Sequence, residues 1–182
     1  MMQRPLMRRM GAMNDLPHGC DAAFQSWVDP LLDQAGAYAY SILRKREDAE
    51  DAIQDALLKA YQNLNRYSRD LSFKGWWFAI IRNCCLDLLR RRQVRAAVVA
   101  VDPSERPSTG RSAHEDFVRK DALTWALHQL SAAHREVLEL RYFGDCSYAE
   151  IATVLGIAEG TVMSRLHAAR KALAVVYRKE TL

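Results

Sequence analysis

Residues 147–173 read SYAEIATVLGIAEGTVMSRLHAARKAL, and this stretch decides the fold of the C-terminal half of the chain. Ser147 and Glu150 stand three residues apart before an apolar run, which is the spacing of a helix capping box. Gly156 follows the predicted helix 148–155, where a residue in the left-handed conformation commonly ends a helix. A second helix is predicted directly after it. The stretch therefore predicts two helices joined by a tight turn.

The predicted second helix carries an apolar stripe on one side and polar side chains on the others. The apolar residues step by three and four and are Val162, Leu166, Ala169 and Leu173. The candidate DNA contacts are Thr161, Ser164, Arg165, His167, Arg170 and Lys171. Arg and Lys donate to guanine edges or phosphates, and Ser and Thr donate to phosphates. A purely structural hairpin with a basic face is the alternative, but the spacing and the turn favour a helix-turn-helix that binds the DNA major groove.

Helical periodicity extends over most of the chain. Apolar residues repeat at three and four positions over 49–64, 77–88 and 123–138, and no segment shows convincing alternation with the period of a strand. A run rich in Pro, Ser and Gly between about Val94 and Ser112 indicates a linker. We therefore predict an all-α fold of two small helical domains joined by a flexible linker. The predicted boundaries are 1–19 for a disordered tail, 20–95 and 115–180 for the two domains, and 96–114 for the linker.

Charge is segregated along the sequence. The 182 residues include 26 basic and 22 acidic side chains, a net charge of +4. Residues 47–55 hold five acids and no base, whereas residues 66–95 hold eight bases and two acids. The block 90–92 is three consecutive arginines, which repel one another unless acids or a polyanion neutralise them. The longest apolar runs are six residues, too short to span a membrane.

Aromatic residues lie beside this basic segment. Trp77 and Phe78 are expected in the core, as buried aromatics usually are. Tyr67, Phe73 and Trp76 instead border a polar and basic stretch. Basic residues interleaved with aromatics suit unstacked, single-stranded bases. A protein that captures an open DNA strand needs this combination, whereas a reader of duplex DNA alone does not.

The sequence gives no support for an enzyme or a metalloprotein. Its five histidines are scattered, and its four cysteines (20, 84, 85 and 146) show no paired zinc-ligand spacing. There is no glycine-rich phosphate loop and no nucleophile motif. We therefore expect no catalytic residue, no metal, no cofactor and no small-molecule substrate. The cysteines are interpreted as small buried residues of a protein in a reducing cytoplasm.

Three segments together resemble the extracytoplasmic-function (ECF) sigma factors, the two-domain minimal form of the sigma-70 family. They are DAEDAIQDALLKAY (48–61), FKGWWFAIIRNCCLDLLRRR (73–92) and LSAAHREVLELRYFGDCSYAEIATVLGIAEGTVMSRLHAARKAL (130–173). Each motif alone is of moderate specificity, but the ordered set with its linker is specific. The resemblance covers roughly residues 20–177 and implies a sigma region 2 bundle followed by a region 4 helix-turn-helix.

The resemblance also implies partners and sites. They are bacterial core RNA polymerase, through its β′ clamp helices and β subunit, promoter DNA, and a cognate anti-sigma factor, all met in the cytoplasm without membrane insertion. The implied polymerase contacts are Asp48, Asp51, Gln54 and Asp55, taken as exposed. The implied contacts to the −10 element are Asn65, Arg66, Tyr67, Arg69, Lys74, Trp76, Arg82, Asn83, Arg90 and Arg91. The implied contacts to the −35 element are the six polar residues of the second helix given above.

The chain departs from the family pattern at four positions. Ala158 stands where a capping Ser is usual, at a cost of about 1 kcal/mol unless Glu159 compensates at the helix start. Met163, Ala168 and Ala79 replace frequent basic residues. Fewer positive charges predict weaker attraction to phosphate and a greater reliance on polymerase.

A helix-turn-helix regulator that binds duplex DNA without polymerase is the alternative function. It explains residues 147–173 equally well, and symmetric footprints with dimerisation would favour it. It leaves the acidic helix, the aromatic stretch and the arginine block without a role.

Overall fold

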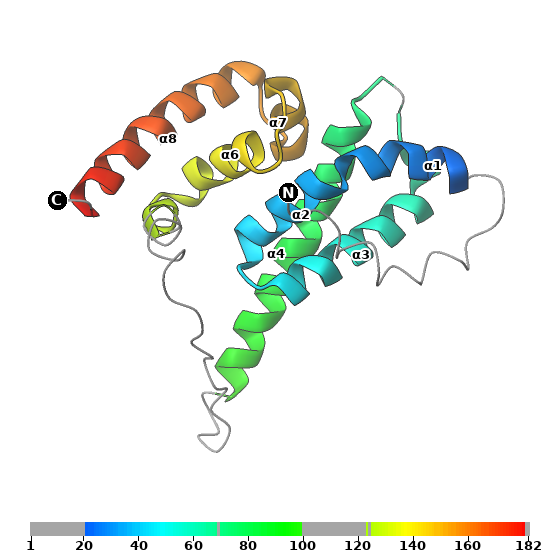
Figure 1. Cartoon of the computed structure of the whole chain (residues 1–182), viewed down its shortest axis with the longest axis horizontal. Helices are drawn as coiled ribbons and strands as arrows, with labels where there is room; N and C mark the ends of the chain where they lie inside the picture. Colours follow the sequence, from blue (N-terminus) through cyan, green and yellow to red (C-terminus); the bar gives the residue numbers. More distant parts are fainter. Residues whose placement is uncertain (1–20, 69, 100–122, 124, 181–182) are drawn as a thin grey trace, which may run out of the picture. The chain divides into compact units, whose positions relative to one another are not determined.

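The computed structural model describes residues 21–68, 70–99, 123 and 125–180, and every regular element among them is helical (Figure 1). The all-α prediction is confirmed. The described residues divide into two units: one ends at Leu32 and contains α1 (Asp21–Val28) and η3 (Asp29–Leu31), and the other begins at Asp33. The predicted tail, 1–19, lies outside the described residues. Among the described helices, none has the length and hydropathy to cross a membrane.

Helices α2 (Leu32–Leu43) and α3 (Arg46–Gln62) are separated by a two-residue break. Arg44 adopts a left-handed backbone with φ of 57°, and Lys45 is extended, so the chain leaves one helix and starts the next. The first turn of α3 contains Glu47 and Asp48, whose negative charges suit the positive end of the helix dipole. Its buried face consists of Ala49, Ala52, Ile53, Ala56, Leu57 and Ala60.

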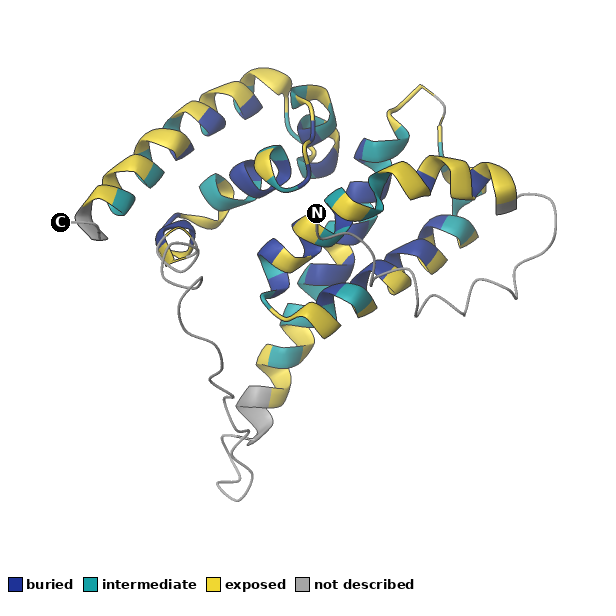
Figure 2. Ribbon diagram, viewed as in Figure 1, coloured by how far each residue is buried: buried dark blue, intermediate teal, exposed yellow. Residues whose placement is uncertain are grey.

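Helix α4 (Phe73–Val99) packs against α3 and supplies the large side chains of the core. The face of α3 toward α4 is rich in alanine. Its small side chains leave space that the large side chains of α4 fill, so the two helices can pack closely. Trp77, Phe78 and Ile81 are fully buried, as the sequence predicted for the two aromatics. Figure 2 shows the buried stretches of α3 and α4 in dark blue, alternating with exposed stretches in yellow.

Helix α4 also continues beyond the predicted start of the linker. Residues 96–99 are helical, whereas the linker was predicted to begin at residue 96. Ala96 and Ala97 are good helix formers, and no proline interrupts the chain before Pro103, which explains the extension. The rest of the predicted linker, 100–114, lies outside the described residues.

The C-terminal part contains α6 (Ala132–Tyr142), α7 (Tyr148–Leu155) and α8 (Glu159–Glu180), preceded by helical residues 125–128. Helix α8 packs against both α6 and α7. Val162, Leu166 and Ala169 are buried, as predicted. Leu173 was predicted in the same stripe but is only half-buried, because it lines an open pocket.

The two ends of α7 have the predicted caps. Ser147 Oγ accepts the Glu150 N–H at 3.2 Å, and Glu150 Oε2 accepts the Ser147 N–H at 2.8 Å. Gly156 closes the helix at φ 65° and ψ 38°, in the left-handed region. These local interactions fix a tight turn between α7 and α8, so the helix-turn-helix is confirmed.

Gly156→Ala tests this turn, and we expect it to lower the free energy of unfolding by about 1 kcal/mol, because a Cβ disfavours the left-handed conformation. The expected loss of stability is not steric, because a Cβ at Gly156 would meet no other atom within 4 Å. The matched control is Gly160→Ala, which also meets nothing within 4 Å but lies in helix α8 without a positive φ. That control should be neutral or stabilising by up to about 1 kcal/mol. Equal effects of the two substitutions in denaturant unfolding would contradict the assignment.

Candidate polymerase and nucleic-acid interfaces

One exposed face of α3 is acidic. Asp51, Gln54 and Asp55 are exposed, and their spacing of three and four residues brings them onto the same side of the helix. Leu58, one turn further, is 51% exposed and lies on this face as well. The sequence pattern did not single out Leu58, because its neighbour Leu57 already completes the buried stripe. Its position outside that stripe was the available signal.

Asp48 does not belong to this exposed face. It was expected to be exposed, but its side chain is only 15% exposed and forms an ion pair with Arg92 of α4. The reason is the packing of α3 against α4, which brings the first turn of α3 beside the C-terminal half of α4. The acidic face therefore consists of Asp51, Gln54 and Asp55 around Leu58.

The arginine block at the end of α4 is partly neutralised within the chain. Arg92 pairs with Asp48, and Arg90 Nη1 pairs with Asp87 Oδ1 at 3.0 Å. Arg91 is exposed. The repulsion inferred from the sequence is therefore relieved by two acids, and Arg90 and Arg91 still present their side chains to solvent. Asn83, on the same helix, is exposed as well.

Three aromatic rings from the predicted base-binding stretch form one cluster. The ring centroids of Tyr67 and Trp76 are 5.2 Å apart, and Phe73 lies 5.6 Å from Tyr67 and 5.8 Å from Trp76. The Tyr67 hydroxyl donates to the Leu71 carbonyl at 2.7 Å, which closes the loop before α4. Tyr67 and Trp76 are half-buried, so the cluster keeps some ring surface accessible.

The polar residues next to this cluster differ in their accessibility. Asn65 and Arg66, in or beside η4 (Leu64–Arg66), are exposed, and Arg69 lies outside the described residues. Lys74 lies over the Phe78 ring, 5.6 Å from its centroid, and its ammonium group also donates a hydrogen bond to a backbone carbonyl. Arg82 forms an ion pair with Glu136, and the Arg82 side chain is 24% exposed. These polar residues thus lie at or near the N-terminal half of α4. The charges of Lys74 and Arg82 already have partners within the chain.

The polar residues of α8 divide into an outward face and two flanks. Ser164, His167 and Lys171 are exposed and share a face by their spacing of three and four residues. That face lies opposite the buried stripe. Thr161 and Arg165 are half-buried on one flank. Within residues 161–171 of α8, a duplex approaching the outward face would meet one permanent positive charge, Lys171, before it reached Arg165.

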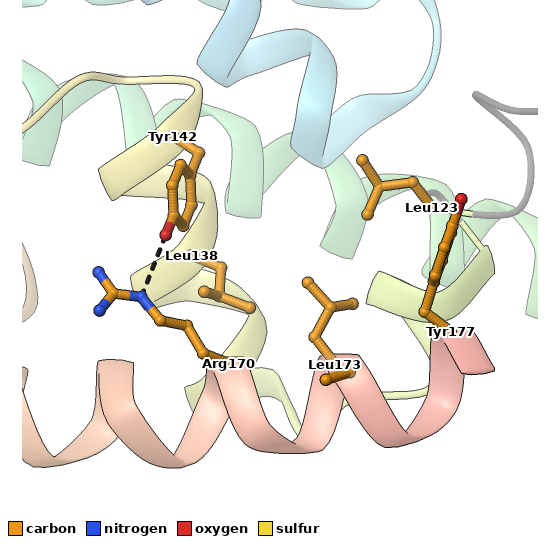
Figure 3. A pocket seen from close by; sticks show the side chains of 7 residues that line it. Leu123, Leu138, Tyr142, Arg170, Leu173 and Tyr177 are labelled. Carbon is orange, nitrogen blue, oxygen red and sulfur yellow. Dashed lines mark hydrogen bonds between the residues drawn. The ribbon is translucent and has the colours of Figure 1, made fainter. Parts of the chain in front are cut away.

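Arg170 lies on the other flank of α8. Its Nε donates to the Tyr142 hydroxyl at 3.0 Å, and its guanidinium lies over the Tyr142 ring at 5.9 Å from the centroid (Figure 3). These two residues border an open, mainly apolar pocket of about 380 Å³ between α6 and α8. The other lining residues are Leu123, Leu138, Leu173, Ala174 and Tyr177. Arg170 is therefore directed toward α6 and away from the outward face of α8.

Glu139 is a charged residue in a buried position. It is 3% exposed, and burial raises its pKa to about 7, although Arg135 and Arg44 oppose this effect. Glu139 in turn contributes to the raised pKa of Tyr38, of which burial is the main cause. The Glu139 carboxyl group of α6 thus lies close to Tyr38 of α2 and to Arg44, which follows α2.

The thiols have the properties of core residues. Cys84, Cys85 and Cys146 are buried and free of disulfides. Burial raises the pKa of Cys85 and of Cys146 to about 12, so both stay protonated at neutral pH and react poorly. No cluster of potential metal ligands is found in the part of the chain that the structure describes.

Family profiles match both halves of the chain. The profile described as "Sigma-70 region 2" matches residues 27–95, and "Sigma-70, region 4" matches residues 120–173. The ECF RNA polymerase sigma factor SigL of Mycobacterium tuberculosis is 36% identical over 167 residues, covering 85% of this chain and 91% of that protein.

Solved structures show the same relationship. The sigma factor RpoE in complex with the anti-sigma factor NepR from Bartonella quintana aligns with a TM-score of 0.66 and 26% identity, over 86% of this chain and 97% of that one. CnrH in complex with the cytosolic domain of CnrY aligns with a TM-score of 0.64 and 26% identity, over 87% and 89%. The similarity therefore extends over both helical parts of the chain.

Proposed function

Because this chain belongs to the ECF RNA polymerase sigma factors of the sigma-70 family, we propose that it binds core polymerase, recognises a promoter at two elements and helps open the DNA. The observation that carries this proposal is the presence, on one chain and in family order, of an acidic helix face, an aromatic and basic surface, and a helix-turn-helix. A regulator of duplex DNA has no use for the first two. The proposed modules are residues 20–99, which include all of α4, and 115–180, joined by 100–114.

We propose that core polymerase docks on the acidic face of α3. Asp51, Gln54 and Asp55 surround the exposed Leu58, so an apolar contact would lie among acidic groups. Interfaces commonly combine such an apolar centre with a polar rim, and the charges speed association with a basic partner. The clamp helices of the β′ subunit are the proposed partner surface. Asp48 would act within the chain, through its ion pair with Arg92.

The aromatic cluster and the N-terminal half of α4 are the proposed −10 surface. Tyr67 and Trp76 offer ring surface on which an unpaired base can stack, and Arg66 and Asn65 lie exposed beside them. Capture of a flipped base offsets an unpairing cost of a few kcal/mol. No covalent chemistry by this chain is part of the proposal.

The outward face of α8 is the proposed −35 surface. Ser164, His167 and Lys171 would enter the major groove, and Thr161 and Arg165 would contact its edge. Arg170 is the least suited of the predicted contacts, because Tyr142 holds it toward α6. Few positive charges on this face make duplex binding without polymerase weak.

We also propose that an anti-sigma factor regulates the protein, in the bacterial cytoplasm where it meets polymerase. One of the two similar structures is the sigma factor RpoE bound to the anti-sigma factor NepR, which supports a partner of the same kind here. The pairing partner of this chain would be a protein that covers the surfaces assigned above.

The test of the function is promoter-dependent transcription by purified bacterial core polymerase, with and without this protein. We expect discrete transcripts that require the protein and arise from a subset of candidate upstream regions, because promoter selection is the activity proposed. Stable duplex binding by the protein alone, with no transcripts, would contradict the proposal and favour a regulator that acts without polymerase.

Asp51→Lys with Asp55→Lys should weaken binding to core polymerase by about tenfold, because two attractive charges become repulsive. The fold should be preserved, since both residues are exposed. The matched control is Asp29→Lys with Asp33→Lys, which changes the net charge equally at two exposed positions. Competition for core polymerase measures the effect, and equal affinities of the two double variants would place the docking face elsewhere.

Lys171→Ala should weaken binding to −35 duplex and lower the slope of log K against log salt by about one, because one phosphate contact is lost. Arg178→Ala is the control, since Arg178 is exposed on the same face of α8 two turns further along. Its removal should change the slope less. Titration of holoenzyme at several salt concentrations measures both, and an equal change for Arg178→Ala would contradict the assignment of the −35 surface to residues 161–171 of α8.

A further inference from the structure

Met163 is an exposed apolar residue near the start of α8. Its side chain is 53% exposed, and it is the fifth residue of the helix, which begins at Glu159. The fold does not require an apolar group at this position, because Val162, Leu166 and Ala169 already form the buried side of α8. Met163 is also not among the −35 contacts proposed above. An accessible apolar side chain thus remains without a role on the helix that is proposed to read DNA.

Met163 lies at the border of the outward face of α8. Residues three or four apart on a helix are neighbours on its surface, so Met163 lies beside Gly160 and His167. His167 belongs to the outward face. The surface one turn before Met163 is open, since a Cβ added at Gly160 would meet no atom of the described residues within 4 Å. The side of α8 that carries Met163 is therefore accessible to a partner.

The beginning of the second helix is the part of a helix-turn-helix that reads bases. Its N-terminal residues contact base edges when the helix lies in the major groove. Met163 lies within the first two turns of α8, and Lys171 lies about 12 Å further along the helix axis. The position of Met163 in the helix therefore directs it to base edges, whereas Lys171 is proposed to contact phosphate.

Thymine is the base that matches an apolar side chain in the major groove. Its C5-methyl group lies there, whereas guanine, adenine and cytosine present mainly hydrogen-bond donors and acceptors. The Met163 thioether donates no hydrogen bond and accepts only weakly, so it would leave those donors and acceptors without partners. Methionine is also unbranched and flexible, which lets it adapt to the position of a methyl group. The chemistry of residue 163 thus favours thymine over the other three bases.

We propose that Met163 is a specificity-determining residue, which selects a thymine in the −35 element through the thymine C5-methyl group. The inference rests on the proposed −35 surface and deepens it, because it names the base feature that one side chain reads. Gly160 has no side chain to occupy the same place, and Ser164 carries no charge. An apolar contact releases no counterions, so the preference for thymine is independent of salt.

Binding of duplexes with a randomised −35 element tests this inference. Holoenzyme is assembled from core polymerase and the full-length chain, and the bound DNA is sequenced. We expect the wild type and Met163→Leu to enrich thymine at one common position, because both keep an apolar side chain. Met163→Gln should lose this enrichment, since its side chain has a similar length but ends in an amide. The matched control is Val175→Ala, which removes an apolar side chain that is 55% exposed on the same helix and should keep the preference.

Deoxyuridine at the enriched position isolates the methyl group, because uracil differs from thymine only in lacking it. We expect this substitution to weaken wild-type binding about fourfold, which is the effect of removing one buried group of methylene size. Binding by Met163→Gln should stay nearly unchanged, and the wild-type loss should be equal at low and high salt. Equal losses for the two proteins, or retained thymine enrichment by Met163→Gln, would overturn the inference. A wild-type loss that falls with salt would also overturn it, because it would indicate a phosphate contact.

The same holoenzymes separate this inference from the proposed function. Transcription that requires the wild-type protein, together with −35 binding that deoxyuridine does not affect, would overturn the role of Met163 alone. Absence of both transcripts and −35 sequence preference for the wild type would overturn the proposed function, and the inference with it. The two failures are therefore distinguishable.

Discussion

The carboxylate of Glu150 is the interaction on which most of the arrangement depends. One oxygen accepts the Ser147 N–H and completes the cap of α7, and the other accepts the Ser72 hydroxyl from the loop before α4. Burial acts to raise the pKa of Glu150, but hydrogen bonds from Ser147 and Ser72 outweigh it, and the pKa is lowered. An ionised group therefore starts the helix-turn-helix and also connects it to the N-terminal module.

Helix α4 has a different role on each side. Trp77, Phe78 and Ile81 are fully buried in the core, so the helix is held firmly. Lys74 and Arg82 carry charges of the proposed −10 surface. Within the chain the same charges bind a backbone carbonyl and a carboxylate, which offer the negative potential that phosphates would otherwise supply.

Tertiary pairing also decides which charges remain available to partners. The sequence shows five acids on α3 and an arginine block on α4, with nothing to separate paired from free members. Packing of α3 against α4 joins Asp48 to Arg92, which leaves Asp51 and Asp55 for a partner. On α8, the Tyr142 hydroxyl holds Arg170, which leaves Lys171 on the outward face. The proposed binding surfaces are therefore narrower than the charged segments of the sequence.

The sequence by itself determined the elements whose causes are local. The Ser147–Glu150 cap, the left-handed Gly156 and the alanine-rich stripe of α3 act within a few residues, so spacing alone predicts them. Only the tertiary structure decided the burial of Glu139, the pairing of Asp48 and the exposure of Leu58. Each of these depends on which helix lies opposite, and sequence periodicity reports the direction of a side chain but not its neighbour. The contact of α4 with α7 has the same origin, because it joins residues that lie 78 positions apart in the chain.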